Sequence, residues 1–131
     1  MSIMEKFKLN GKIALVTGCS KGIGFGIAKG LAEAGADIIG VSSTLDKGSD
    51  IEKYVKSIGR NFHYFNCDFS KRQNTHSFIN ELGKNNLEPN ILVSNAGSLI
   101  RTELDEHSDD NWDRIIEINL SSQFILAREL S

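Results

Sequence analysis

Thr17-Gly18-Cys19-Ser20-Lys21-Gly22-Ile23-Gly24 is the stretch that decides the fold of this 131-residue chain. An apolar run, residues 12–17, leads into it, and residues 23–34 after it carry apolar side chains at helical spacing. A short continuous apolar run is typical of a strand buried on both faces. The stretch is therefore predicted to carry the chain from a buried strand, through a tight turn, into a helix.

The three glycines of this stretch meet three separate needs of a phosphate-binding turn. Gly18 permits the sharp exit from the strand, Gly22 lets the backbone approach a pyrophosphate, and Gly24 lets the helix lie close to the strand. The free N–H groups and the dipole of the helix start favour anionic phosphates. The spacing is Gly-x3-Gly-x-Gly, and no Gly-Lys-Ser/Thr of a Walker A loop follows. The alternative is an ordinary tight turn, but the position between strand and helix favours phosphate binding.

Outward from this turn, strands and helices alternate along the whole chain. Further strands are predicted at residues 37–41, 62–67 and 91–94, and further helices at 50–58, from about 70, and from Ser108 to the end. Ser49 and Ser108 are candidate N-caps, and Ser70 with Gln73 forms a capping-box pattern. The alternation predicts an α/β, Rossmann-type, doubly wound parallel sheet, with strand order 3-2-1-4 and helices on both faces. Residues 1–131 are expected to form a single dinucleotide-binding domain.

Composition excludes several other classes of function. The 15 Lys and Arg residues against 17 Asp and Glu leave a net charge of −2, which offers no basic field for nucleic acid. No apolar run reaches the roughly 20 residues of a membrane span, and residues 1–6 lack the apolar core of a signal peptide. A cytoplasmic location, with neither nucleic acid nor membrane as partner, is expected. The two cysteines are too few for a zinc site, and the three histidines show no ligand spacing, so no metal is expected.

Three ordered motifs resemble those of the short-chain dehydrogenase/reductase family. Thr-Gly-x3-Gly-Ile-Gly at residues 17–24 is similar to its cofactor motif, and Asn95-Ala96-Gly97 follows the fourth strand as in that family. Asn119 matches its helix asparagine, and Asp68 matches an acidic position that contacts the adenine. Within the family, residues 36–40, 95–101 and 111–113 resemble the 2-deoxy-D-gluconate 3-dehydrogenases, also called 2-dehydro-3-deoxy-D-gluconate 5-dehydrogenases. The same stretches resemble the gluconate 5-dehydrogenases almost as closely.

The resemblance implies an NAD(P)-dependent oxidoreductase that interconverts a hydroxyl and a ketone on a small-molecule sugar acid by hydride transfer. It also implies a homotetramer for a full-length protein. The cofactor-binding residues that it implies are Gly18, Ser20, Lys21, Gly22, Ile23, Gly24, Ser42, Asp68, Asn95, Ala96 and Gly97. Asn119 is implied as a catalytic residue that holds water in a proton relay. The alternative for Asn119 is a structural amide that ties its helix to a neighbouring loop, because a polar group beside an apolar stripe needs hydrogen bonds.

The choice between NAD and NADP stays open in the sequence. A carboxylate at the end of the second strand would bind the ribose 2′-OH of NAD, but Ser42 and Ser43 stand there and Asp46 lies further into the loop. Lys21 would favour the 2′-phosphate of NADP by its charge, or it is an ordinary surface lysine. The subfamily resemblance implies NAD, which is the cofactor expected here.

One part of the family's chemistry has no counterpart in these residues. The family uses a Ser and a Tyr-x3-Lys pair, in which the tyrosine exchanges a proton with the substrate. Ile58 follows Tyr54 by four positions, and Asp68 follows Tyr64 by four. The chain is therefore expected to be part of a longer enzyme or a truncated gene product, and to be inactive alone. The alternatives are a non-catalytic nucleotide-binding remnant or another short-chain reductase.

Overall fold

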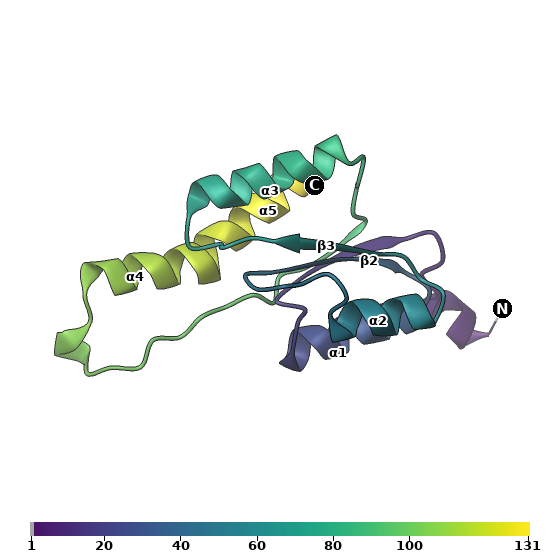
Figure 1. Cartoon of the computed structure of the whole chain (residues 1–131), viewed down its shortest axis with the longest axis horizontal. Coiled ribbons are helices and arrows are strands. Elements are labelled where there is room, and N and C mark those ends of the chain that lie inside the picture. The colour runs from purple at the N-terminus through teal and green to yellow at the C-terminus, as the bar shows by residue number, and fades with distance from the viewer. Residues whose placement is uncertain (1) are drawn as a thin grey trace.

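A four-stranded parallel sheet forms the centre of the computed structural model, which describes residues 2–131 (Figure 1). Its strands are β1 (Ile13–Thr17), β2 (Asp37–Ser42), β3 (Phe62–Asn66) and β4 (Ile91–Val93). They lie in the order β3-β2-β1-β4, which confirms the predicted topology. Thr17 pairs with Val41, and Val16 with Val93, so the carboxyl ends of the central strands lie together at one edge of the sheet.

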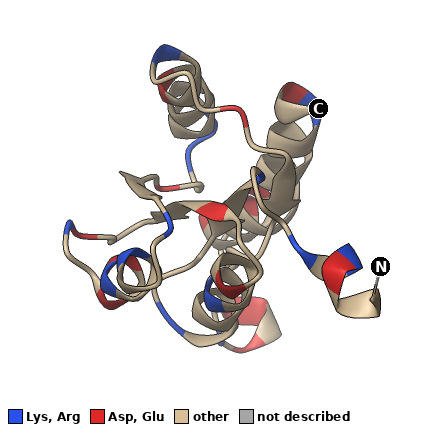
Figure 2. Cartoon of the chain, turned by 90° about the vertical axis from the view of Figure 1, so that its right-hand side faces the viewer, with Lys and Arg blue, Asp and Glu red and all other residues tan. Residues whose placement is uncertain are grey.

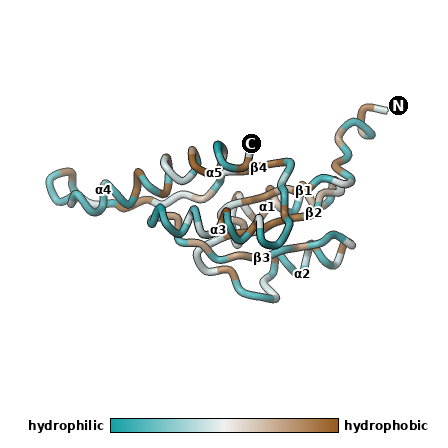
Figure 3. Tube along the Cα trace, turned by 90° about the horizontal axis from the view of Figure 1, so that it is seen from above, coloured by the Kyte–Doolittle hydropathy of each residue, from teal (hydrophilic) through white to brown (hydrophobic). Residues whose placement is uncertain are grey.

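Helices cover both faces of this sheet, as predicted (Figure 1). On one face lie α1 (Gly22–Glu33) and α2 (Asp50–Ser57), and on the other lie α3 (Arg72–Lys84) and α5 (Ser122–Leu130). Successive side chains of β1 point to opposite faces of the sheet, as they do along any strand. Ala14 and Val16 belong to the core under α1 and α2, whereas Leu15 belongs to the core under α3 and α5. In Figure 3 the hydrophobic segments accordingly run along β1 and β2.

Outside the sheet layers, α4 (Asp109–Ile116) and two short 3₁₀ helices, Ile3–Phe7 and Leu104–Glu106, lie at the periphery. The segment between β4 and α4 extends away from the sheet (Figure 1). Charged residues of both signs are spread over the outer helices and loops (Figure 2). None of the helices between residues 2 and 131 combines the length and the apolar character needed to cross a membrane.

The buried face of α1 differs from the stripe that the helical spacing of Ile23, Ile27, Leu31 and Ala34 predicts. Gly24, Ala28 and Ala32 are buried, whereas Ile23 is 76% exposed. Small residues face the sheet because the helix lies very close to the glycine turn, where a Cβ on Gly24 would collide with the carbonyl oxygen of Gly18. The larger Ile27 stays half-buried.

Two of the three expected helix caps are present, and the third is wrong. The Ser49 hydroxyl accepts a hydrogen bond from the backbone N–H of Glu52 at 3.4 Å, and the Ser108 hydroxyl accepts one from Asn111 at 3.0 Å. Ser70 does not cap α3. Its hydroxyl donates instead to Oδ1 of Asp68 at 2.7 Å, so the helix begins after Lys71 without a side-chain cap. The competing carboxylate two residues earlier overrides the capping-box pattern.

The last helix is interrupted rather than continuous. A π-helical turn, Glu117–Ser121, separates α4 from α5. Arg72 of α3 forms a two-bond ion pair with Glu117, with N–O distances of 3.0 and 3.3 Å, at the start of this turn. Asn119 lies at its centre. Isolated π-helical turns inside α-helices are frequent at functional sites, and this one faces the loop that follows β4.

Candidate functional site

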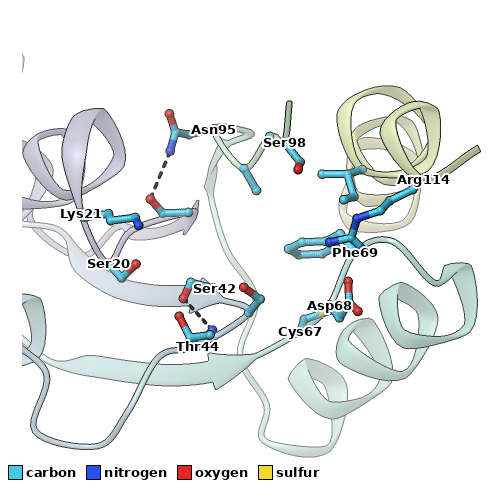
Figure 4. Close-up of a pocket in the computed structure, with 15 residues that line it drawn as sticks. Ser20, Lys21, Ser42, Thr44, Cys67, Asp68, Phe69, Asn95, Ser98 and Arg114 are labelled. Carbon is cyan, nitrogen blue, oxygen red and sulfur yellow. Dashed lines mark hydrogen bonds between the residues drawn. The ribbon is translucent and has the colours of Figure 1, made fainter. Parts of the chain in front are cut away.

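A cavity of about 340 Å³ opens at the carboxyl edge of the sheet. Five segments form its walls: the glycine turn after β1, the end of β2, the loop after β3, the loop after β4, and the end of α4 with the π-helical turn (Figure 4). The residues that line it are Gly18, Ser20, Lys21, Ser42, Ser43, Thr44, Cys67, Asp68, Phe69, Asn95, Ala96, Gly97, Ser98, Arg114 and Ile118. This is where parallel α/β sheets bind ligands, because the strand order reverses between β1 and β4.

The glycine turn has the geometry that its sequence predicts. Gly18 and Gly22 have φ angles of +67° and +64°, a region that residues with a Cβ seldom adopt. A Cβ on Gly18 would lie 2.8 Å from the side-chain nitrogen of Asn95, whereas a Cβ on Gly22 would meet no protein atom within 4 Å. Gly18 therefore serves close packing inside the protein. The space beside Gly22 is open, as an approach for an external group requires.

Hydrogen bonds hold the glycine turn against the loop that follows β4. The Thr17 hydroxyl accepts from the backbone N–H groups of Asn95, at 2.9 Å, and Ala96, at 2.8 Å. The Asn95 side-chain amide donates to the carbonyl oxygens of Thr17 and Gly18, both at 3.2 Å. The backbone N–H of Gly18 also donates to the carbonyl of Val41 at 2.8 Å. Two segments almost 80 residues apart in sequence are thus held as one rigid edge of the cavity.

The end of β2 presents hydroxyl groups to the cavity and no carboxylate. Ser42 is 7% exposed, and its hydroxyl accepts from the backbone N–H of Thr44 at 3.2 Å. Asp46 is exposed and does not line the cavity. Lys21 lies on the neighbouring wall and brings a positive charge (Figure 4). This corner of the cavity is therefore polar and carries positive rather than negative charge.

Asp68 provides the negative charge of the cavity. The side-chain hydroxyl and then the backbone N–H of Ser70 donate to its carboxylate and hold the pKa of Asp68 below its ordinary value; the positive charge of Arg114 acts in the same direction. The carboxylate is consequently ionised at neutral pH and can only accept hydrogen bonds.

Asn119 does not line the cavity, and its side-chain amide is engaged with one residue of the loop after β4. Its Oδ1 accepts from the backbone N–H of Ser98 at 2.8 Å, and its Nδ2 donates to the carbonyl oxygen of Ser98 at 2.9 Å. This arrangement agrees with the structural-amide alternative, in which Asn119 ties its helix to the loop. Gln123, one turn further along the helix, adds a long contact from its side-chain nitrogen to the carbonyl oxygen of Ala96 at 3.5 Å.

The structure brings most of the expected site residues to one cavity. Those that line it are Gly18, Ser20, Lys21, Ser42, Asp68, Asn95, Ala96 and Gly97. Those that do not are Gly22, Ile23, Gly24 and Asn119, although the two glycines belong to the turn that forms its wall. The neighbours that sequence reasoning left out of the site are Ser43, Thr44, Cys67, Phe69, Ser98, Arg114 and Ile118. Most of these adjoin an expected residue in sequence, and a wider window around each motif would have found them.

Neither tyrosine of the chain lies at the cavity. Tyr54 is on α2, where its hydroxyl donates to the carboxylate of Glu33, and Tyr64 is a half-exposed residue of the edge strand β3. Among residues 2–131 no group of three or more His, Cys, Asp or Glu side chains is placed to hold a metal ion. The charged and polar groups of the cavity suit binding of a polar organic molecule.

Comparison with known proteins gives consistent results. Residues 12–131 match the family described as short chain dehydrogenase. The chain is 57% identical over 129 residues to a 2-dehydro-3-deoxy-D-gluconate 5-dehydrogenase of Pseudoalteromonas atlantica, covering 98% of this chain and 51% of that protein. A 3-oxoacyl (acyl-carrier-protein) reductase of Agrobacterium tumefaciens, solved with NADP bound, superposes with a TM-score of 0.88 at 28% identity, covering 99% of this chain and 50% of that one. An L-sorbose reductase of Gluconobacter frateurii, solved with NADPH and L-sorbose, has a TM-score of 0.85 at 27% identity, covering 95% and 48%. The chain spans about half the length of these proteins.

Proposed function

The chain belongs to the short-chain dehydrogenase family, and on that premise we propose that it forms the dinucleotide-binding part of an NAD(P)-dependent oxidoreductase. Residues 1–131 then act as one domain that holds the cofactor at the carboxyl edge of its sheet. The bound nicotinamide would supply hydride transfer, and the residues described here bind and orient the dinucleotide.

The observation that carries this proposal is the geometry of Gly22. Its φ of +64° and the open space beside it leave room for a group that approaches the backbone closely from outside. The helix α1 begins at this residue, so its free N–H groups and dipole favour a negatively charged group there. A pyrophosphate fits both conditions. The absence of a Gly-Lys-Ser/Thr sequence argues against a nucleoside triphosphate with magnesium.

The remaining residues of the cavity then divide along the length of a dinucleotide. The pyrophosphate lies on the turn from Gly18 to Gly24, the ribose of the adenosine lies at Ser42, and the base lies toward Asp68. The nicotinamide half lies along the loop after β4, which holds Asn95, Ala96 and Gly97. The residues of this proposed site are Gly18, Ser20, Lys21, Gly22, Ile23, Gly24, Ser42, Asp68, Asn95, Ala96 and Gly97.

The cavity supports binding of NADP alongside the NAD that the resemblance implies. NAD-binding sites of this architecture hold the ribose 2′-OH with a carboxylate after the second strand, and no carboxylate lines the cavity there. Lys21 supplies a positive charge on the neighbouring wall, which suits a 2′-phosphate. A comparison of NAD(H) with NADP(H) in one titration measures the preference directly.

For the substrate, we propose a sugar acid whose hydroxyl and ketone forms are interconverted. The support is the name of the relative from Pseudoalteromonas atlantica, which is 57% identical to this chain.

A homotetramer is proposed for the whole enzyme. Leu120 and Phe124, which are 62% and 60% exposed beside α3, offer an apolar surface for such contacts. Asn119 is proposed to act in the proton relay through the loop that it holds at Ser98.

A second candidate is a nucleotide-binding protein without turnover. The positions of Tyr54 and Tyr64, both away from the cavity, favour it for these 131 residues taken alone, because the proton donor of the family's reaction is a tyrosine. The two candidates differ in turnover and agree in cofactor binding. A test for oxidation of 2-dehydro-3-deoxy-D-gluconate with NAD⁺ or NADP⁺ as the hydride acceptor, followed by the formation of NADH or NADPH, separates them.

Titration of the chain with NAD(H), NADP(H), ATP and GTP, followed by calorimetry or by nicotinamide fluorescence, tests the proposal. We expect saturable binding of a nicotinamide dinucleotide and weaker binding of both triphosphates. Tighter binding of ATP with magnesium would overturn the dinucleotide assignment.

A further inference from the structure

Arg72 and Glu117 form an ion pair that the stability of α3 alone does not explain. Arg72 is the first residue of α3, where the positive end of the helix dipole disfavours a cation. Its guanidinium nevertheless donates two hydrogen bonds to the Glu117 carboxylate, from Nη2 at 3.0 Å and from Nε at 3.3 Å. The pair therefore joins the start of α3 to the start of the π-helical turn, across 45 positions of sequence.

The carboxylate of this pair is held more firmly than that of an ordinary surface ion pair. The side chain of Glu117 is only 16% exposed, whereas that of Arg72 is 59% exposed. A single exposed ion pair contributes little to stability, but a two-bond pair fixes the orientation of both groups as well as their distance. Because Glu117 is the first residue of the π-helical turn, the pair restrains the backbone at that point.

The shape of the π-helical turn decides which way the side chains beyond it point. Without the extra residue of such a turn, the side chains on its two sides would rotate relative to one another by roughly 100°. Inside the turn, the buried hydroxyl of Ser122 donates to the carbonyl oxygen of Ile118 at 2.7 Å, a type of bond that bends helices. The turn is therefore restrained at its first residue by Arg72 and from within by Ser122.

Asn119 carries the position of this turn to the cavity. Its side-chain amide holds both the backbone N–H and the carbonyl oxygen of Ser98, at 2.8 and 2.9 Å. Ser98 lines the cavity on the wall formed by the loop after β4 (Figure 4). A continuous series of contacts thus leads from Arg72, which lies outside the cavity, through Glu117 and Asn119 to the loop at Ser98.

We propose that Arg72 is a positioning residue for the nicotinamide end of the bound dinucleotide. It acts through Glu117, which sets the π-helical turn, and through Asn119, which then holds the loop at Ser98. This inference rests on the proposed function, in which the nicotinamide half lies along the loop after β4. The adenosine half lies against β2 and the loop after β3, so it should not depend on Arg72.

The experiment compares two ligands on the full 131-residue chain by calorimetry. NADH carries both halves of the dinucleotide, whereas ADP-ribose lacks only the nicotinamide. The variants are Arg72→Ala, Arg72→Lys, Glu117→Gln and the double variant Arg72→Ala/Glu117→Gln. Arg128→Ala is the matched control, since Arg128 is an exposed arginine of α5 that pairs with the adjacent Glu129.

Two measurements without ligand accompany the titrations. Hydrogen exchange of the Ser98 backbone amide, followed by NMR, reports on the bond that this amide donates to Asn119. Thermal unfolding of each variant shows whether a change in binding reflects a change in folding.

We expect Arg72→Ala to weaken NADH binding about fivefold, the scale of one hydrogen bond, and to leave the affinity for ADP-ribose within about twofold of the wild type. The Ser98 amide should exchange several-fold faster in this variant. Arg72→Lys should fall between, because a lysine keeps the charge but loses the two-bond geometry. The double variant should bind NADH no more weakly than Arg72→Ala, since each single change already removes the pair. Arg128→Ala should match the wild type.

Three results would overturn the inference while leaving the proposed function intact. The first is wild-type NADH affinity in Arg72→Ala. The second is an equal loss for NADH and ADP-ribose, which would assign the ion pair to general stability. The third is weaker NADH binding with unchanged Ser98 exchange, which would exclude the route through Asn119.

Failure of the proposed function would look different. A wild-type chain that binds neither NADH nor ADP-ribose would overturn the proposed function, and with it the assignment of this loop to the nicotinamide. The Ser98 exchange rates, measured without ligand, would still decide whether Arg72 holds the loop.

Discussion

Thr17 and Asn95 hold each other by reciprocal hydrogen bonds. The Thr17 hydroxyl accepts from the backbone N–H of Asn95 at 2.9 Å, and the Asn95 side chain donates to the carbonyl oxygen of Thr17 at 3.2 Å. The same Asn95 amide reaches the carbonyl oxygen of Gly18 at 3.2 Å. Because Gly18 begins the glycine turn, the position of the proposed pyrophosphate site depends on a side chain that follows β4.

Replacing Asn95 should therefore affect both stability and cofactor binding. Asn95→Ala removes the donor to two carbonyl oxygens, and we expect a loss of about 1–3 kcal/mol in the free energy of unfolding. Asn95→Asp should cost more, because a carboxylate would face the same two oxygens. Urea unfolding measures the loss, and a dinucleotide titration measures binding. Ser94→Ala, at the exposed neighbouring position, is the control and should change neither quantity.

Gly22 and Gly26 form a matched pair of test positions, because an added Cβ would meet no protein atom at either one. Gly26 lies inside α1 without a positive φ, so Gly26→Ala should stabilise the chain by roughly 0.5–1 kcal/mol and leave binding unchanged. Gly22→Val should destabilise it modestly, because its φ is +64°. It should also abolish dinucleotide binding by filling the space proposed for the pyrophosphate.

A substitution at Gly24 tests packing inside the protein, whereas the substitution at Gly22 tests dinucleotide binding. Gly24→Ala places a Cβ against the carbonyl oxygen of Gly18, so we expect a clear loss in the free energy of unfolding. Dinucleotide binding that survives in a folded Gly22→Val variant would contradict the assignment of Gly22.

The pH dependence of stability should reveal the environment of Asp68. Hydrogen bonds from Ser70 lower the pKa of Asp68 in the folded chain. Its ionisation therefore favours the folded state above the ordinary carboxyl pKa of about 3.9. This contribution should be lost as the pH falls through the lower, folded-state pKa. Comparing urea unfolding of wild type and Asp68→Asn between neutral and acidic pH tests the prediction. The stability advantage of the wild type should shrink on acidification.

Ser70→Ala provides the control for this effect. Removal of the hydroxyl should raise the pKa of Asp68 toward its ordinary value, which carbon-detected NMR titration of the carboxyl group measures directly. An identical titration of Asp68 in both proteins would show that the Ser70 hydroxyl does not lower the pKa of this carboxyl group.

The sequence predicts the framework of this fold because the decisive signals are local. The apolar runs and the glycines between residues 12 and 24 identify a buried strand, a tight turn and a helix, and the structure confirms all three. The same local reasoning misassigns Ser70, because the pattern of Ser70 and Gln73 does not reveal that the Asp68 carboxylate competes for the hydroxyl.

The cavity is less predictable, because it depends on contacts between distant segments. Arg114 joins Asp68 in one cavity across 46 positions of sequence, and no spacing rule predicts that meeting. The π-helical turn around Asn119 is equally hard to predict from the sequence, because one widened turn hardly changes the apolar periodicity of residues 109–130. Motif positions therefore identify the edges of the site, and only the folded chain shows which neighbours complete it.

The two cysteines should react slowly with thiol reagents, and Cys67 should also report cofactor binding. Burial raises the pKa of Cys19 to about 11 and that of Cys67 to about 12, with the Asp68 carboxylate adding to the second shift. Both thiols are free and buried. Compared with an unperturbed thiol of pKa about 8.5, each should alkylate at least roughly a hundredfold more slowly at pH 7.5, because the thiolate is the reactive form.

Site-resolved mass spectrometry after iodoacetamide treatment measures the two rates separately. Cys67 lines the cavity and Cys19 does not, so saturating dinucleotide should slow Cys67 further and leave Cys19 unchanged. Unfolding in urea should bring both cysteines to the rate of a free thiol, which controls for the reagent. Rapid labelling of Cys67 in the folded chain would contradict its burial, and equal protection of both cysteines by the dinucleotide would indicate global stabilisation instead of contact in the cavity. Protection confined to Cys67 would locate the ligand beside the loop after β3, at the end of the cavity where the base is proposed to lie.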